Sequence, residues 1–175
     1  MTYMKFEDVV RLWQADKKRY VKRSTYYAYS LLIANHLLPA FSGLTDVTEN
    51  LVQEFVLEKL RRGLSSKAVK DILIVLKMIL RYADKNGYMA HHDIDVKYPV
   101  ERQTTHIDLL SLGNQKFLID YIENHLTFMN LGIYICLSTG LRIGEICALV
   151  WDDIDMNAGV VNVSRTLKRS AEVSN

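Results

Sequence analysis

The sequence predicts a mainly α-helical protein with a short β element near its C-terminal end. Apolar residues recur at helical spacing through the first half, whereas residues 161–164 alternate between apolar and polar side chains. With 49% hydrophobic residues, 8 Gly and 2 Pro among 175 residues, the composition is that of a globular protein. Disordered, collagen-like and low-complexity classes are therefore excluded.

Four helices are expected in the first half, and together they can enclose one small core. The first spans about residues 5–20, because its apolar side chains recur every three or four positions. Ser24 and Thr25 are expected to cap the second helix, which Pro39 and Gly43 end.

The third and fourth helices complete this predicted core. The third begins near residue 48 and stops at Gly63. The fourth starts at the Ser65–Ser66 cap and closes at Gly87, and its apolar residues follow the i, i+3, i+4, i+7 pattern of an amphipathic helix. Residues 1–96 are therefore predicted to form one helical domain.

A polar, extended stretch separates this domain from the rest of the chain. Pro99 disfavours helix at Tyr98, and no amphipathic pattern follows it at once. Residues 97–107 are therefore predicted to be a linker, and residues 108–175 to belong to a second domain.

The second domain is expected to begin with helices and to end in a β element. Helices are predicted at about residues 111–124 and 127–137, with a break at 138–140 and a short helix after it. A turn at 157–159 precedes the alternating residues 161–164, which predict a strand.

Positive charge is concentrated in the first domain. Residues 1–98 hold 16 Lys and Arg and 11 Asp and Glu, whereas residues 99–175 hold 6 and 9, so the net charge of +2 divides into +5 and −3. Five cations lie within residues 17–23. A second group comprises Arg61, Arg62, Lys67 and Lys70. Such groups are typical of solvated helix faces and of phosphate contacts, and charge alone leaves both interpretations open.

Neither a membrane span nor a disulfide framework is expected. No stretch approaches the roughly 18 uninterrupted apolar residues that cross a bilayer. Acidic residues stand near the N-terminus where a signal peptide has an apolar core. Because Cys136 and Cys147 are too few for a disulfide framework, we expect a cytoplasmic protein.

The most specific chemistry lies at residues 138–155. Gly140 ends one helix, so Arg142 falls at the start of the next, where a helix dipole favours anions and a planar guanidinium can bind a phosphate through two donors. Glu145, three residues later, lies on the same face and can hold the arginine in place. From spacing alone, an ordinary Arg–Glu pair at a helix start is the alternative.

The stretch TGLRIGEICALVWDDID resembles the first active-site box of the tyrosine recombinases, the phage-integrase family, which reads T-G-x-R-x-x-E-x-x-x-L followed by W-x-D-I-D. Residues 23–48 and the segment that begins with Leu64-Ser65-Ser66-Lys67 resemble the family's helical core-binding domain. The resemblance implies a four-helix, SAM-like core-binding domain followed by the α-rich front of a catalytic domain, with the start of a β-hairpin.

The resemblance also implies the chemistry of DNA strand exchange. In this family a Tyr attacks a phosphate of duplex DNA and forms a 3′-phosphotyrosyl intermediate, while two Arg, a Lys and a His or similar group stabilise the transition state, without a metal or nucleotide cofactor. Arg142 matches the first of the two arginines, and Glu145 supports it. Lys168 lies in the region of the active-site Lys, and its alternative role is that of a strand or turn cation near DNA.

Double-stranded DNA is the partner that the resemblance implies, with self-association on DNA in the full-length form. The second and fourth helices of the core-binding domain face the DNA in this family. The candidate contacts are accordingly Lys22, Arg23, Ser24, Thr25, Tyr26, Ser66, Lys67 and Lys70. For Ser24 and Ser65, simple N-capping is an equal alternative.

The chain departs from the family pattern after Arg142. None of its five His has an Arg three residues later, and its last Tyr, Tyr134, precedes Arg142. The second Arg box and the nucleophile are therefore missing from these 175 residues, and the chain is predicted to be a truncated recombinase that does not cleave DNA alone. The alternatives are an inactive DNA-binding module that competes with the full recombinase, and a helical transcription regulator.

Two further acidic or histidine-rich segments are interpreted as structural. His91, His92 and Asp93, with Asp95, lie in one loop, and such neighbouring loop residues cannot readily wrap one metal ion. Asp152, Asp153 and Asp155 resemble paired acid–base carboxylates, but the family pattern makes them turn and strand-start residues. No metal site is therefore expected.

Overall fold

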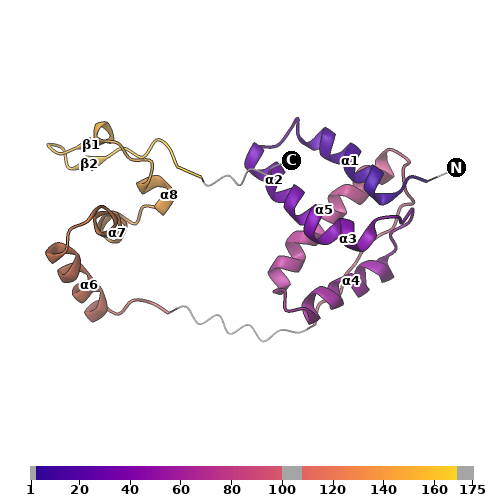
Figure 1. The fold of residues 1–175 in the computed structure, drawn as a ribbon, viewed down its shortest axis with the longest axis horizontal. Coiled ribbons are helices and arrows are strands. Elements are labelled where there is room, and N and C mark those ends of the chain that lie inside the picture. Colours follow the sequence, from indigo (N-terminus) through magenta and orange to yellow (C-terminus); the bar gives the residue numbers. More distant parts are fainter. Residues whose placement is uncertain (1–2, 100–107, 169–175) are drawn as a thin grey trace. The chain divides into compact units, whose positions relative to one another are not determined.

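Residues 3–99 and 108–168 are described by the computed structural model, and they separate into two units, unit 1 (3–99) and unit 2 (108–168) (Figure 1). Unit 1 consists of helices, and unit 2 adds one small β ladder to three helices. The mainly α-helical fold that the sequence predicts is confirmed.

Unit 1 is built around its longest helix, α5. Its elements are α1 (Phe6–Lys17), α2 (Arg23–Leu32), the π turn η1 (Ile33–Leu37), α3 (Leu38–Phe41), α4 (Glu49–Arg61) and α5 (Ser66–Lys85). Helix α5 contacts α1, α2 and α4, so it is the common partner on which these helices pack (Figure 1).

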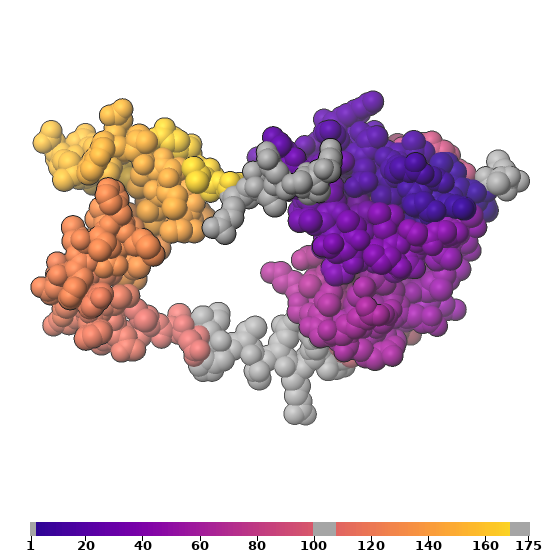
Figure 2. Space-filling model, in the orientation of Figure 1, coloured from indigo at the N-terminus to yellow at the C-terminus, as the bar shows by residue number. Residues whose placement is uncertain are grey.

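A single hydrophobic cluster fills unit 1. Its largest fully buried side chains include Trp13 and Phe41. The ring of Phe41 lies 5.6 Å from that of Phe6 and 5.1 Å from that of Phe55, which ties α3 to α1 and α4. Such tilted aromatic pairs contribute beyond the area that they bury. In the space-filling view the atoms of unit 1 form one continuous body (Figure 2).

The start of the second helix differs from the prediction. Ser24 and Thr25 were expected to cap it, but both lie inside α2, and its N-cap is Lys22, whose side chain makes no capping hydrogen bond. The capping prediction for Ser24 and Thr25 is therefore wrong. The first turn of α2 presents a cationic pair, Lys22 and Arg23, in place of a serine cap.

The end of the second helix also differs from the prediction. Pro39 does not end the helical segment, which continues to Phe41 before Gly43 takes a left-handed conformation with φ of 83°. A π turn precedes the proline, and the N–H of Leu38 donates to the carbonyl of Ile33, five residues back. The widened turn accommodates Pro39, which has no N–H to donate.

After α5 the chain returns along unit 1 as an extended segment. The N–H of Lys97 donates to Oε1 of Gln53 over 2.9 Å, and Nε2 of Gln53 donates to the carbonyl of Lys97 over 3.0 Å. Nζ of Lys70 lies 5.0 Å from the ring centroid of Tyr98. Lys97 and Tyr98, at the start of the predicted linker 97–107, therefore contact α4 and α5; residues 100–107 lie outside the described residues.

Unit 2 follows the order of elements that the sequence predicts. It contains α6 (Leu112–Asn124), α7 (Phe128–Thr139), α8 (Ile143–Ile146), the 3-10 turn η2 (Trp151–Asp153), β1 (Ile154–Asp155) and β2 (Val160–Val161). Ser111 caps α6 and Thr127 caps α7, each through a 3.2 Å hydrogen bond to a backbone N–H. The strands are antiparallel and only two residues long.

Unit 2 buries little of its apolar surface. Ile122 is the only hydrophobic side chain buried among its described residues, whereas Phe117 is 74% exposed, Phe128 97% and Trp151 81%. Its atoms form a slender body in the space-filling view (Figure 2). Among the residues that the structure describes, no helix combines the length and the apolar character needed to cross a membrane.

Candidate active site and nucleic-acid interface

Arg142 stands at the start of α8 and is held there by Glu145. Its backbone is extended, and its N–H donates to Oε2 of Glu145 over 2.8 Å. Its Nη1 donates to the other carboxylate oxygen, Oε1, over 3.2 Å. The arginine side chain is 86% exposed although Glu145 is only 20% exposed. The carboxylate therefore fixes the backbone and one edge of the guanidinium while the rest remains open to an anion.

The ionised form of Glu145 is stabilised by this arrangement. The backbone N–H of Arg142 is the main cause that lowers the pKa of Glu145, and the guanidinium lowers it further through a hydrogen bond and its charge. Helix α8, however, has only four residues, Ile143–Ile146, so its macrodipole adds little. The guanidinium, more than the short helix, therefore supplies the positive charge at this point.

The segment after β2 lies against α8. The N–H of Leu167 donates to the carbonyl of Gly144 over 2.7 Å. Arg165 donates from Nε to the carbonyl of Ala148 over 3.0 Å and from Nη2 to Oδ2 of Asp153 over 2.5 Å. Lys168 follows Leu167 directly and is exposed. The structure thus brings the backbone that carries Lys168 onto the helix that Arg142 begins, a contact that no local sequence pattern indicates.

Two of the three acidic residues between α8 and β2, Asp153 and Asp155, have structural partners. Oδ2 of Asp153 accepts from the N–H of Val150 over 2.9 Å as well as from Arg165. Oδ1 of Asp155 accepts from the N–H groups of Asn157 and Ala158 over 3.0 and 2.9 Å. These bonds shape the turn that pairs β1 with β2, as their interpretation as turn residues predicts.

The candidate DNA contacts of α2 lie on the surface of its first turn. Lys22, Arg23 and Ser24 are exposed, whereas Thr25 and Tyr26 are partly buried. Nε and Nη2 of Arg23 donate to the hydroxyl of Tyr27 over 3.1 and 3.0 Å, and the guanidinium lies 5.4 Å from the centroid of that ring. Tyr27 thus orients one of the candidate cations.

The candidates on α5 divide into surface and buried residues. Lys67 and Lys70 are exposed, but Ser66 retains only 7% of its accessible surface. Its neighbour Ser65 is the N-cap, because its hydroxyl accepts from the N–H of Ala68 over 3.2 Å. We therefore remove Ser66 from the set of surface contacts. Because α2 and α5 touch, the two groups of cations lie on adjacent helices of one unit.

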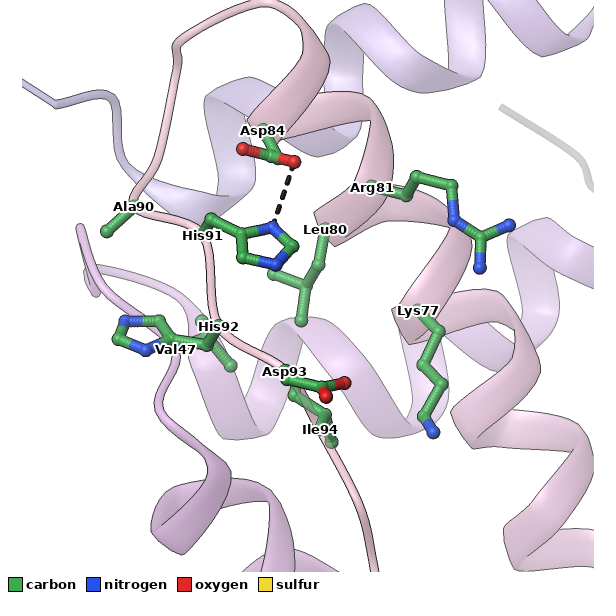
Figure 3. A pocket seen from close by; sticks show the side chains of 10 residues that line it. All are labelled: Val47, Lys77, Leu80, Arg81, Asp84, Ala90, His91, His92, Asp93 and Ile94. Atoms are coloured by element: carbon green, nitrogen blue, oxygen red, sulfur yellow. Dashed lines mark hydrogen bonds and ion pairs between the residues drawn. The ribbon is translucent and has the colours of Figure 1, made fainter.

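The loop histidines each bind a separate aspartate. Figure 3 shows the pocket between α5 and the segment that follows it, where Nδ1 of His91 lies 2.9 Å from Oδ2 of Asp84. His92 points the other way (Figure 3). Its Nε2 lies 2.6 Å from Oδ1 of Asp46. The two pairs fasten the segment to unit 1. No three His, Cys, Asp or Glu side chains within the described ranges are grouped so that they could hold a metal ion.

Both units match models of one protein family. Residues 5–60 match the phage integrase N-terminal SAM-like domain, and residues 114–175 match the phage integrase family. The chain therefore belongs to the phage integrase, or tyrosine recombinase, family.

Similar proteins include one that is named as defective and one that is named as a tyrosine recombinase. The chain is 33% identical over 109 residues to the putative defective protein IntQ of Escherichia coli (strain K12), covering 61% of this chain and 26% of that protein. It is 25% identical over 174 residues to a tyrosine recombinase XerC-like protein of Caldanaerobacter subterraneus subsp. tengcongensis, covering 96% of this chain and 39% of that one. The chain thus spans well under half the length of these relatives.

Two solved structures share the fold. The Tn1549 transposon integrase in complex with a circular intermediate DNA matches 94% of this chain with a TM-score of 0.76 at 23% identity. The same integrase in complex with transposon right end DNA matches 97% with a TM-score of 0.71, also at 23% identity. In both cases the chain covers 55% of the other protein. These likenesses confirm the fold, a helical domain followed by an α-rich second part.

Proposed function

We propose that this chain binds duplex DNA through unit 1 and supplies Arg142 to the phosphate-binding centre of a tyrosine recombinase. The observation that carries the proposal is the geometry of Arg142: its backbone and one Nη are fixed by Glu145 while the side chain is 86% exposed. A guanidinium placed in advance near a phosphate stabilises negative charge as it develops in phosphoryl transfer.

DNA binding is assigned to the exposed cations of α2 and α5. Lys22 and Arg23 stand at the start of α2, and Lys67 and Lys70 in the first turns of α5. Cations on two touching helices can contact successive phosphates of one duplex, and such contacts supply sequence-independent affinity. Ser24, Thr25 and Tyr26 lie on the same turn of α2 and complete the proposed contact surface.

The chemistry of the proposed centre needs groups beyond those of this chain. In strand cleavage a tyrosine oxygen forms a bond to phosphorus as the bond to the 5′-oxygen breaks and that oxygen gains a proton. Arg142 would bind the non-bridging oxygens, and Lys168 is the candidate for a second cation at the same phosphate. No Tyr follows Arg142 in the 175 residues, so we propose that the chain alone binds DNA without cleaving it.

A charge-reversal experiment tests this function. We expect Lys22→Glu with Arg23→Glu to abolish binding to inverted-repeat or junction DNA in a gel-shift assay, and Arg142→Ala to leave it nearly unchanged. Lys5→Glu with Lys85→Glu is the matched control, because it makes the same change of charge at two exposed lysines outside the proposed surface. Equal loss in all three variants would show that the binding surface is misplaced.

A second candidate function is competition with a complete recombinase. It is favoured by the similarity to a relative whose name marks it as defective, the putative defective protein IntQ. We expect the chain, added in excess to a complete recombinase on their shared site, to reduce strand exchange, and the Lys22→Glu, Arg23→Glu variant to have no effect. Binding to ordinary promoter operators but not to junction DNA would instead favour a transcription regulator.

A further inference from the structure

The closest approach between the post-β2 segment and α8 occurs at Gly144. The carbonyl of Gly144 accepts from the N–H of Leu167 over 2.7 Å. A Cβ atom placed on Gly144 would lie 2.7 Å from the carbonyl oxygen of Leu167 and 2.7 Å from Oγ1 of Thr166. Carbon and oxygen normally approach no closer than about 3.3 Å, so any side chain at this position would push the segment away.

Helix formation does not explain a glycine at this position. Gly144 lies inside α8, where alanine would favour the helix more, and it is not among the glycines with positive φ. Gly113 in α6 is a useful contrast, because a Cβ there would meet no atom within 4 Å. The close packing of Thr166 and Leu167 is therefore the property that requires glycine at position 144.

A second tether fixes the same segment at the other end of α8. Arg165 donates to the carbonyl of Ala148, just beyond the helix, and to Asp153, which is itself held by the N–H of Val150. The segment is therefore attached at two points, at Gly144 and at Ala148. Lys168 is the residue that follows the Gly144 attachment, and Arg142 precedes that glycine by two residues.

We propose that Gly144 is a positioning residue, whose missing side chain lets residues 165–167 lie on α8 and so presents Lys168 together with Arg142. The inference rests on the proposed function, in which these two cations bind the same phosphate. Glu145 fixes Arg142 from within α8, whereas only the Gly144 contact and the Arg165 tether fix the backbone of Lys168 among the described residues.

Amide hydrogen exchange and ¹⁵N relaxation of the whole 175-residue chain test this proposal. In Gly144→Ala, we expect exchange of the Leu167 amide to accelerate by about tenfold or more and the heteronuclear NOE of Lys168 to fall, because the segment is released. The amides of Ile122 and Arg142 should keep their exchange rates. Gly113→Ala, which adds the same atom in open space, should leave Leu167 and Lys168 unchanged.

Several results would overturn the proposal. The first is an unprotected Leu167 amide in the wild-type chain. The second is an unchanged exchange rate of the Leu167 amide in Gly144→Ala. The third is an equal rise in the exchange rate at Ile122 in that variant, which would indicate general loosening of unit 2. The double variant Gly144→Ala, Thr166→Ala removes one of the two crowded oxygens and should restore part of the protection. A double variant no more protected than Gly144→Ala would contradict the assigned contact.

A variant that adds no atom to α8 covers the case in which Gly144→Ala fails to fold. Arg165→Ala removes the second tether and should lower the heteronuclear NOE of Lys168 without crowding. Complete loss of Leu167 protection in that variant would show that Arg165, and not the Gly144 contact, holds the segment, and would overturn the positioning role. NMR titration of the wild-type chain with duplex DNA separates this proposal from the function on which it rests. If the Arg142 side-chain signals do not change when DNA is added, the proposed function is contradicted. The Leu167 result would not be affected.

Discussion

Unit 1 encloses its own core, whereas unit 2 exposes most of its apolar side chains. In unit 1 a buried cluster runs from Phe6 to Ile94 and includes residues of every helix but α2, whose Tyr29 and Leu32 pack against it partly buried. In unit 2, Ile122 alone is buried among the described hydrophobic residues. Both units contain regular helices with a serine N-cap, α5 and α6, so local helix formation is not what distinguishes them.

The difference shows that helical periodicity and a closed core are separate properties. Burial of apolar surface supplies most of the free energy that stabilises a fold, and isolated helices of this length are marginal in water. We therefore expect the stability of the described chain to reside in unit 1. In the proposed function unit 2 contributes chemistry instead, through exposed groups that include Arg142 and Lys168.

A matched pair of phenylalanine truncations gives the largest expected contrast. Phe6→Ala in unit 1 should lower the free energy of unfolding by about 3–5 kcal/mol, because it leaves a cavity at a fully buried site. Phe117→Ala in unit 2 removes a ring that is 74% exposed and should change it by at most about 0.5 kcal/mol. Urea unfolding followed by circular dichroism measures both. Equal losses would show that unit 2 shares the core.

The pH dependence of the Arg142–Glu145 contact is a smaller, local effect. Because the pKa of Glu145 is lowered, the contact is complete above the ordinary carboxyl pKa and is lost as the pH falls through the lowered value. Arg142→Ala keeps the backbone N–H that is the main cause of the lowered pKa, so the pKa of Glu145 should stay lowered in this variant. Arg142→Pro removes that N–H and should return the pKa toward its ordinary value.

A carbon-detected NMR titration of the Glu145 carboxyl measures this effect in both variants. If the Arg142→Ala variant alone restores an ordinary pKa, the guanidinium and not the backbone is the main partner, and the geometry at the start of α8 is wrong. The contact involves exposed groups, so we expect no measurable change in the unfolding of unit 1 over the same pH range.

Features encoded by neighbouring residues were predictable from the sequence. The apolar period of α5, the caps Ser65, Ser111 and Thr127, and the left-handed Gly140 all follow from residues within one or two turns. The Arg142–Glu145 pair was predictable for the same reason, because a separation of three places both side chains on one face of a helical turn.

Features encoded across the chain were not predictable. The contact of Leu167 with Gly144 and the pairing of Arg165 with Asp153 join distant positions, and no local period indicates them. The burial of Ser66 depends on the packing around α5. Its position next to a capping serine at a helix start would instead predict an exposed side chain. The π turn before Pro39 is likewise invisible to the rule that proline ends a helix.

The salt dependence of DNA binding tests the central claim most directly, namely that unit 1 binds DNA while unit 2 presents a phosphate-binding arginine. For the whole chain on one duplex, the slope of log K against log salt should fall in magnitude by about 0.9 for each phosphate contact removed. We expect Lys22→Ala with Arg23→Ala to lower the magnitude of that slope by nearly twice this amount, because two contacts are lost. Lys5→Ala with Lys85→Ala should leave the slope unchanged. An unchanged slope in the first pair, or an equal fall in the second, would contradict the account.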